Sequence, residues 1–194
     1  MKAKEHGIIG GLFFLTSGIV SVISIFIQAK GGSAPLSTAL TIICDALFIS
    51  GALFTLLALK QITLKLRMFD THNKFLYGFG MLSLSGILSF GYIFELGFAN
   101  NRWYSLGVAT SFFIAAILLI VAFLRMGKRS GIKPFTFSSY LLIAMVIIPP
   151  YIGEGGKISN IAYALLYATG NVLLIAFSVL LFVSFIQIKQ SFKQ

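Results

Sequence analysis

Apolar residues form six long runs along the chain, separated by short polar segments. The runs cover residues 7–28, 37–60, 73–97, 104–126, 135–152 and 160–188. Crossing the hydrocarbon core of a bilayer takes roughly 20 residues of helix. Because backbone polar groups need partners in lipid, each run is expected to be helical. The pattern predicts an all-α integral membrane bundle of six transmembrane helices, forming a single domain over residues 1–194.

Composition supports a membrane protein. Of the residues, 58% are hydrophobic and 10% are charged, and the mean hydropathy is +0.96. Soluble domains are roughly 45–50% apolar and about 25% charged, so this chain has too few polar residues to cover itself in water. The net charge of +10 raises the question of nucleic acid. The charges lie in short segments between apolar runs, however, so we expect them to face anionic lipid headgroups, with no nucleic acid bound.

The basic residues alternate between the two sides of the predicted membrane. Three of the 15 lie after the first, third and fifth runs: Lys30, Arg102 and Lys157. The others lie at the termini, or in and beside the segments that join the second run to the third and the fourth run to the fifth: Lys2, Lys4, Lys60, Lys65, Arg67, Lys74, Arg125, Lys128, Arg129, Lys133, Lys189 and Lys193. Cytoplasmic segments of membrane proteins carry an excess of Lys and Arg. The alternation therefore predicts a multi-pass protein of the cell membrane with both termini in the cytoplasm.

Local signals suggest where some helices begin and end. Thr71 or Asn73 is expected to cap the third helix, Gly127 to end the fourth, and Pro134 to start the fifth. Residues 62–69 have helical spacing of apolar positions, so they form either a helix in the inner headgroup plane or a simple loop.

The first and third runs resemble each other at an offset of 68 residues. Five positions match: Gly10, Ser17, Gly18, Ile19 and Ser21 with Gly78, Ser85, Gly86, Ile87 and Ser89. The basic residues that close the even runs recur at similar spacing: Lys60, Arg125 and Lys189. The chain can therefore be read as three parallel-repeat helical hairpins, and many transporters place their sites between repeats.

Two acids lie inside apolar runs, Asp45 in the second and Glu95 near the outer end of the third. A charge at the centre of a membrane costs about 2.5–3.5 kcal/mol on insertion scales, so each acid is expected to have a functional or structural role. With the predicted topology, several polar side chains lie in the outer half of the membrane and Asn171 lies near its middle. Together they predict an outward-facing polar pocket, formed by Asp45, Thr41, Tyr92, Glu95, Tyr163, Tyr167 and Asn171. In the alternative, Asp45 and Asn171 hold helices together through hydrogen bonds, and Glu95 reaches the interface.

Small residues line one side of the first run: Gly7, Gly10, Gly11, Ser17, Gly18, Ser21 and Ser24. Such residues let helices approach closely. This side is expected to be a packing surface, either within the chain or against a second copy.

The sequence lacks the residue patterns that several kinds of catalytic or cofactor site require. The histidines, His6 and His72, lie at the cytoplasmic boundary, so no pair can hold a haem in mid-membrane. The single cysteine, Cys44, leaves no CxxC pair, and neither HExxH nor a Gly-rich phosphate loop occurs. We therefore predict no catalytic, metal or cofactor site, and no enzyme.

Four segments carry a family resemblance: Leu57-Ala58-Leu59-Lys60, Phe75-Leu76-Tyr77-Gly78-Phe79-Gly80, Lys128-Arg129-Ser130-Gly131, and residues 183–189. On these segments the chain resembles an uncharacterised prokaryotic family of multi-pass membrane proteins, domain of unknown function 996. The resemblance implies a multi-pass membrane protein and no particular activity or residue role.

Three functions are weighed on this basis. The first is a non-enzymatic subunit or assembly component of a membrane complex, whose partners are membrane lipids and other membrane subunits or itself. The second is a small transporter or channel with a pocket around Asp45. The third is a lipid-modifying enzyme, for which the chain offers only Asp45, Glu95 and tyrosines.

Overall fold

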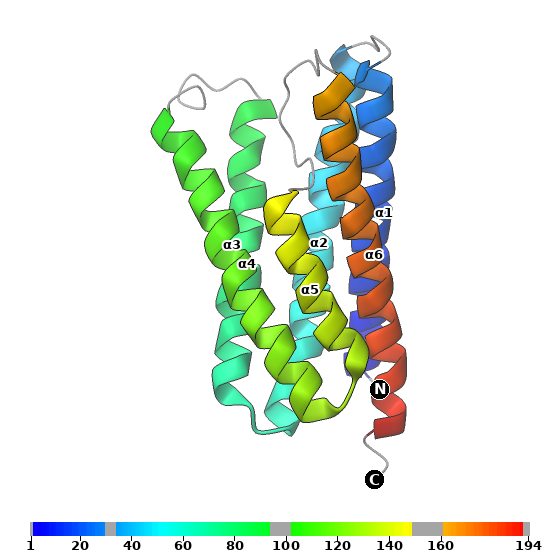
Figure 1. Ribbon diagram of the computed structural model, residues 1–194, viewed down its shortest axis with the longest axis vertical. Coiled ribbons are helices and arrows are strands. Elements are labelled where there is room, and N and C mark those ends of the chain that lie inside the picture. Colours follow the sequence, from blue (N-terminus) through cyan, green and yellow to red (C-terminus); the bar gives the residue numbers. More distant parts are fainter. Residues whose placement is uncertain (1, 30–33, 94–101, 149–160, 192–194) are drawn as a thin grey trace.

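Six helices follow one another along the chain in a computed structural model that describes residues 2–29, 34–93, 102–148 and 161–191 (Figure 1). They are α1 (Lys2–Ala29), α2 (Ala34–Lys65), α3 (Phe69–Ile93), α4 (Arg102–Ser130), α5 (Lys133–Ile147) and α6 (Ile161–Ser191). The prediction of an all-α chain with six helices is confirmed.

The helices form a closed ring in chain order. Each helix packs against the one before and the one after it, and α6 packs against α1 to close the ring. The start of α1, the end of α6, the α2–α3 turn and the α4–α5 turn all lie at one end of the bundle (Figure 1). We call this the basic end, because it carries Lys60 and Lys65 of α2 and Lys128 and Arg129 of α4.

Four helices are long and apolar enough to cross a membrane. Their apolar portions are Lys2–Gln28, Thr38–Lys65, Leu106–Ser130 and Ala168–Ile188. Helix α5 has only 15 residues, about 22 Å at 1.5 Å per residue, against a hydrocarbon core of about 30 Å. Helix α3 is long enough, but polar residues occupy its first turns and serines and glycines dilute the rest. The fold is therefore compatible with a membrane protein.

The turn between α2 and α3 differs from both sequence expectations. Residues 62–65 belong to α2, so residues 62–69 are neither a separate interfacial helix nor a long loop. The N–H of Met68 donates to the Thr63 carbonyl at 2.8 Å, and that of Arg67 to the Leu64 carbonyl at 3.1 Å. With Arg67 at φ 54°, this is a Schellman ending, which satisfies the last carbonyls of a helix. The predicted capping by Thr71 or Asn73 is wrong, because α3 already begins at Phe69.

The turn between α4 and α5 also lies further along the chain than expected. Helix α4 continues to Ser130, and Gly131 follows it with φ +70°. The predicted ending at Gly127 is therefore wrong, while Pro134 does stand in the first turn of α5. Gly127 instead allows close packing, because a Cβ added there would lie 2.8 Å from the backbone nitrogen of Thr136. The described helix ends at Ile147, and Pro149-Pro150 lie outside the described residues.

Phenylalanine rings fill the interior of the ring of helices. Phe14 of α1 contacts Phe48 of α2 edge-on, with ring centroids 5.2 Å apart. Phe177 of α6 lies 5.8 Å from Phe123 of α4. Each of these side chains is at most 3% exposed. Large apolar side chains also cover the outside of the bundle, including Leu12, Leu53, Phe113 and Val179. Helices that are apolar on all sides suit a lipid environment.

The small-residue side of α1 packs within the chain. A Cβ added at Gly10 would lie 2.7 Å from the backbone nitrogen of Thr55 in α2. One added at Gly18 would lie 2.8 Å from Ile175 of α6. Of the two expectations for this surface, the structure shows the intramolecular one, with α1 wedged between α2 and α6.

Candidate functional site

Asp45 of α2 is completely buried. Thr41, one turn before it on α2, is 5% exposed, and Ala52 and Thr55 continue the buried side of the helix. Thr38, three residues before Thr41 on the same helix, is exposed. The carboxyl group therefore sits in the part of the bundle where α2 is covered by its neighbours.

Hydrogen bonds join α1 to α2 beside Asp45. The hydroxyl of Ser17 donates to the carbonyl of Cys44 at 3.0 Å. The thiol of Cys44 donates to the carbonyl of Ser17 at 3.4 Å, and the hydroxyl oxygen and sulfur are 3.3 Å apart. Ser21 and Ser24, on the next turns of α1, are also buried. Sequence reasoning read these residues as packing positions and missed the Ser17–Cys44 pair, although serine within a small-residue stripe is a known interhelical donor.

Asn171 of α6 is completely buried on the other side of α1. Its backbone carbonyl would lie 3.6 Å from a Cβ added at Gly18, the residue that follows Ser17. Asp45 and Asn171 thus belong to the two helices that flank the same segment of α1. The three-helix group α1, α2 and α6 therefore contains several buried polar residues, which we call the buried polar region: Ser17, Thr41, Asp45 and Asn171.

The predicted polar pocket is described only in part. Thr41, Asp45 and Asn171 are buried in the three-helix group. The side chains of the other members lie outside the described part of the structure: Tyr92, Glu95, Tyr163 and Tyr167. The outward-facing pocket as a whole therefore stays a prediction.

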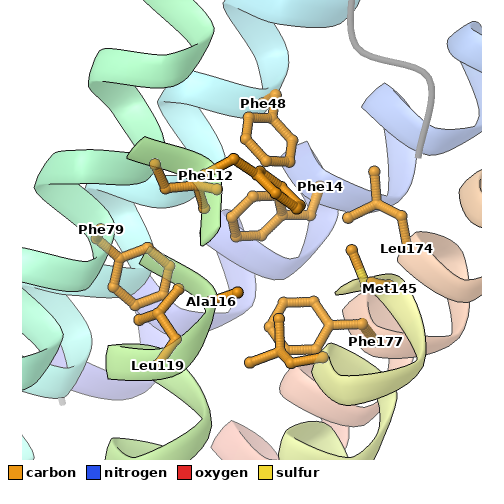
Figure 2. Close-up of a pocket in the computed structure, with 11 residues that line it drawn as sticks. Phe14, Phe48, Phe79, Phe112, Ala116, Leu119, Met145, Leu174 and Phe177 are labelled. Carbon is orange, nitrogen blue, oxygen red and sulfur yellow. The ribbon is translucent and has the colours of Figure 1, made fainter. Parts of the chain in front are cut away.

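A cavity of about 20 Å³ lies at the centre of the bundle, where all six helices meet (Figure 2). Its lining is apolar throughout: Phe14, Phe48, Phe79, Leu82, Phe112, Ala116, Leu119, Leu142, Met145, Leu174 and Phe177. The space is about the size of one water molecule, but apolar cavities of this kind stay dry because a water needs polar partners. Asp45 is not among the lining residues. The buried polar region and the central cavity are therefore separate features.

A cluster of charges at the basic end ties α3 to α4. The carboxylate of Asp70, in the first turn of α3, accepts from Lys74 on the same helix and from Arg125 of α4. The hydrogen bond from Lys74, followed by the charges of Lys74 and Arg125, holds the pKa of Asp70 below its usual value. Because the Asp70 side chain is 64% exposed, water screens this cluster and its contribution to stability is small.

Both histidines lie at the basic end, beside polar side chains of α2. Nδ1 of His72 is 3.3 Å from the hydroxyl of Thr63, and Nδ1 of His6 is 3.5 Å from the amide nitrogen of Gln61. Within the described ranges, His, Cys, Asp and Glu side chains form no group of three or more that could hold a metal ion. The described residues therefore assemble no metal centre around these histidines.

Comparisons of the chain with protein-family models, with curated proteins and with solved structures found no match. The resemblance to domain of unknown function 996 accordingly stays a prediction, and the case for function rests on this chain's own residues.

Proposed function

We propose that the protein crosses the cell membrane six times, with the basic end in the cytoplasm. Four helices already have the length and hydropathy for this. Helices α3 and α5 stand in the same ring between them, so the lipid that surrounds the four also surrounds these two. Trp103, 77% exposed, lies at the opposite end of α4, where an interfacial aromatic is favourable. Cytoplasmic placement of the basic end follows from the positive-inside rule.

The proposal includes an internal repeat of helical hairpins. Ser17 of α1 donates to the Cys44 carbonyl of α2, and Ser85 of α3 donates to the Val108 carbonyl of α4. The two donors are 68 residues apart and the two acceptors 64. The glycines repeat the relation: Gly10 packs on positions 51 and 55, and Gly78 on positions 115 and 119. Equivalent contacts at equivalent positions support repetition of the first hairpin in the second.

Within the membrane, we propose that the protein acts as a non-enzymatic subunit or assembly component. The observation that carries this is the packed axis of the bundle, where apolar side chains from all six helices meet around one small cavity (Figure 2). Where the structure describes it, this part of the axis is filled by apolar side chains, which suits a packing role. The outward side of α4 favours contact with another membrane helix, because it presents Gly107, with open space around it, between Leu106 and Thr110.

Purification in mild detergent from the native membrane tests this role. Mass determination and identification of copurifying chains should find stoichiometric membrane partners, or a defined homo-oligomer. A lone monomer in every detergent tried would contradict the assembly role.

A small transporter is the second candidate, and the complete burial of Asp45 favours it. A carboxyl group in the interior of a membrane bundle is costly and commonly marks a substrate or proton pathway. In proteoliposomes, Asp45→Asn should abolish solute flux if this candidate is correct, and it should leave assembly intact if the first is. Asp70→Asn is the matched control, because it removes an exposed carboxylate at the basic end. Flux that is equal in both variants and the parent would exclude a role for Asp45 in transport.

A further inference from the structure

The α4–α5 turn brings three cations together at the surface of the basic end. Lys128 and Arg129 stand in the last turn of α4, and Lys133 is the first residue of α5. All three side chains are exposed. The glycine contact described above holds the two helices close, since Gly127 packs directly on the backbone of Thr136. The cations are therefore confined to one small area.

No described carboxylate balances these three charges. The described acids are Glu5 in the first turn of α1, Asp45 in the interior, and Asp70 in the first turn of α3. Asp70 is engaged by Lys74 and Arg125. These two partners belong to α3 and α4, so the Asp70 charge is already paired. The α4–α5 turn thus carries three exposed cations that form no ion pair with a described carboxylate.

The start of α5 adds to this potential. Its N-cap residue is Ile132, whose side chain cannot accept from the first N–H groups, and no side-chain cap is formed. Uncapped helix N-termini carry partial positive charge that favours anions. The effect is smaller than that of the three cations, but it has the same sign and the same location.

An aromatic and then an aliphatic surface continue along α5 from these cations. Phe137 and Tyr140 are 52% and 54% exposed, and their rings lie 6.4 Å apart at 63°. Ile143 and Ile147 follow them, 42% and 74% exposed. From Lys133 to Ile147 the helix rises about 21 Å. The order of cation, amphipathic aromatic and aliphatic side chains matches the order of phosphate, ester and acyl chain in a phospholipid.

We propose that this surface, formed by Lys128, Arg129, Lys133, Phe137 and Tyr140, binds the headgroup of an anionic phospholipid. The proposal rests on the membrane placement proposed above, with the basic end at the headgroup level. It goes further by assigning one binding site, because general attraction to a negative membrane would involve both basic turns equally.

Tryptophan fluorescence of the full-length protein in mixed micelles tests the site. Trp103→Phe combined with Tyr140→Trp leaves one tryptophan, located at the proposed site. Phosphatidylglycerol and phosphatidylcholine, each with brominated acyl chains, serve as quenchers. Half-maximal quenching is expected at a mole fraction of phosphatidylglycerol at least about tenfold lower than that of phosphatidylcholine, given the attraction of anionic lipid for each basic residue.

Charge-neutralised variants locate the effect. The combined substitutions Lys128→Gln, Arg129→Gln and Lys133→Gln should remove the preference for phosphatidylglycerol. The matched control combines Lys60→Gln, Lys65→Gln and Arg67→Gln, which removes three positive charges at the α2–α3 turn. This control variant should keep its preference for phosphatidylglycerol. Circular dichroism and elution volume in size-exclusion chromatography check that the variants fold. If the triple variant misfolds, Lys133→Gln alone replaces it and should lose part of the preference for phosphatidylglycerol.

Three results would overturn the proposal. If the two lipids quenched equally, the surface would not select anionic lipid, and an acidic segment of a partner subunit would be the better candidate to neutralise its cations. If both triple variants lost the preference for phosphatidylglycerol equally, the protein would attract anionic lipid through its overall charge and would have no specific binding site at the α4–α5 turn. If soluble glycerol phosphate displaced the brominated phosphatidylglycerol as effectively as unlabelled phosphatidylglycerol does, the site would be one for a free phosphate ester. Because the assay uses the isolated chain, none of these results depends on whether partner subunits copurify.

Discussion

Buried polar residues in this bundle are accommodated by small residues on the facing helix. Ser17 pairs with Cys44 across the α1–α2 interface, and Asn171 lies beside Gly18. Interhelical hydrogen bonds in membranes average only about 0.6 kcal/mol, so close packing must supply much of the stability. The sequence alone identified Asp45 and Asn171 as unusual, because a polar residue inside an apolar run stands out. It did not identify the Ser17–Cys44 pair, since that pair depends on how the two helices are rotated.

Gly10→Ala tests the close approach of α1 and α2. The added methyl group would lie 2.7 Å from the backbone nitrogen of Thr55 and 3.1 Å from the carbonyl oxygen of Gly51, and backbone atoms cannot move aside as a flexible side chain can. We expect a loss of about 1–3 kcal/mol in the free energy of unfolding, measured by denaturant titration in detergent.

Gly80→Ala is the control for this prediction. Gly80 stands in the middle of α3 with no atom within 4 Å of an added Cβ, so the same substitution should be neutral or slightly stabilising. Equal destabilisation by both substitutions would mean that the cost comes from helix backbone effects and that the α1–α2 contact does not limit the side chain at position 10.

At the scale of the elements, helix ends were the least predictable feature. The sequence placed the end of the fourth helix at Gly127, but the structure extends it to Ser130 and turns at Gly131. Both glycines are compatible with a helix end, and only the packing of Gly127 on Thr136 separates their roles. Likewise, the Schellman ending at Arg67 uses a residue that carries no sequence signal for positive φ.

The link between α3 and α4 through Asp70 should depend on pH. Since Lys74 lowers the pKa of Asp70 in the folded protein, the link contributes stability above the unfolded-state pKa, about 4, and loses it as pH falls through the lower folded value. Asp70→Asn should therefore melt slightly below the parent at pH 7, and the difference should shrink as the pH falls below about 4.

Thermal melts of the two proteins between pH 7 and pH 3 measure this difference. Added salt at pH 7 should reduce it as well, because the cluster is exposed. A difference that persists unchanged at pH 3 and in high salt would show that the substitution acts through something other than charge.

On the scale of the whole molecule, aromatic contacts at the axis connect α6 both to its neighbour α1 and to α4, which is not its neighbour in the ring. Phe177 of α6 reaches both Phe14 of α1 and Phe123 of α4, at centroid distances of 6.1 and 5.8 Å. Helices α4 and α6 are not adjacent in the chain-order ring, which has α5 between them. Among the described residues, these rings join the helices into one packed unit around the small central cavity.

Phe177→Ala should enlarge that cavity and break both contacts. We expect a loss of about 3–5 kcal/mol in the free energy of unfolding, the usual cost of removing a buried phenyl ring. Phe113→Ala is the matched control, because that ring is 53% exposed on the outside of α4. Its loss should be below about 0.5 kcal/mol in detergent titrations. A similar cost at the two positions would mean that the axis is not the stabilising core.

By itself, the sequence determined that the chain is all-helical, that it has six helices in this order, and roughly where each lies. Long apolar runs allow little else, because their backbone needs internal hydrogen bonds in lipid. The sequence did not determine which sides of the helices face inward, since helices that are apolar all round have no amphipathic face to indicate it. Only the tertiary structure decided that the small-residue side of α1 packs between α2 and α6, that Asp45 is buried, that Ser17 pairs with Cys44, and that phenyl rings fill the axis. These features follow from the fit of side chains between helices, which depends on their rotation and register.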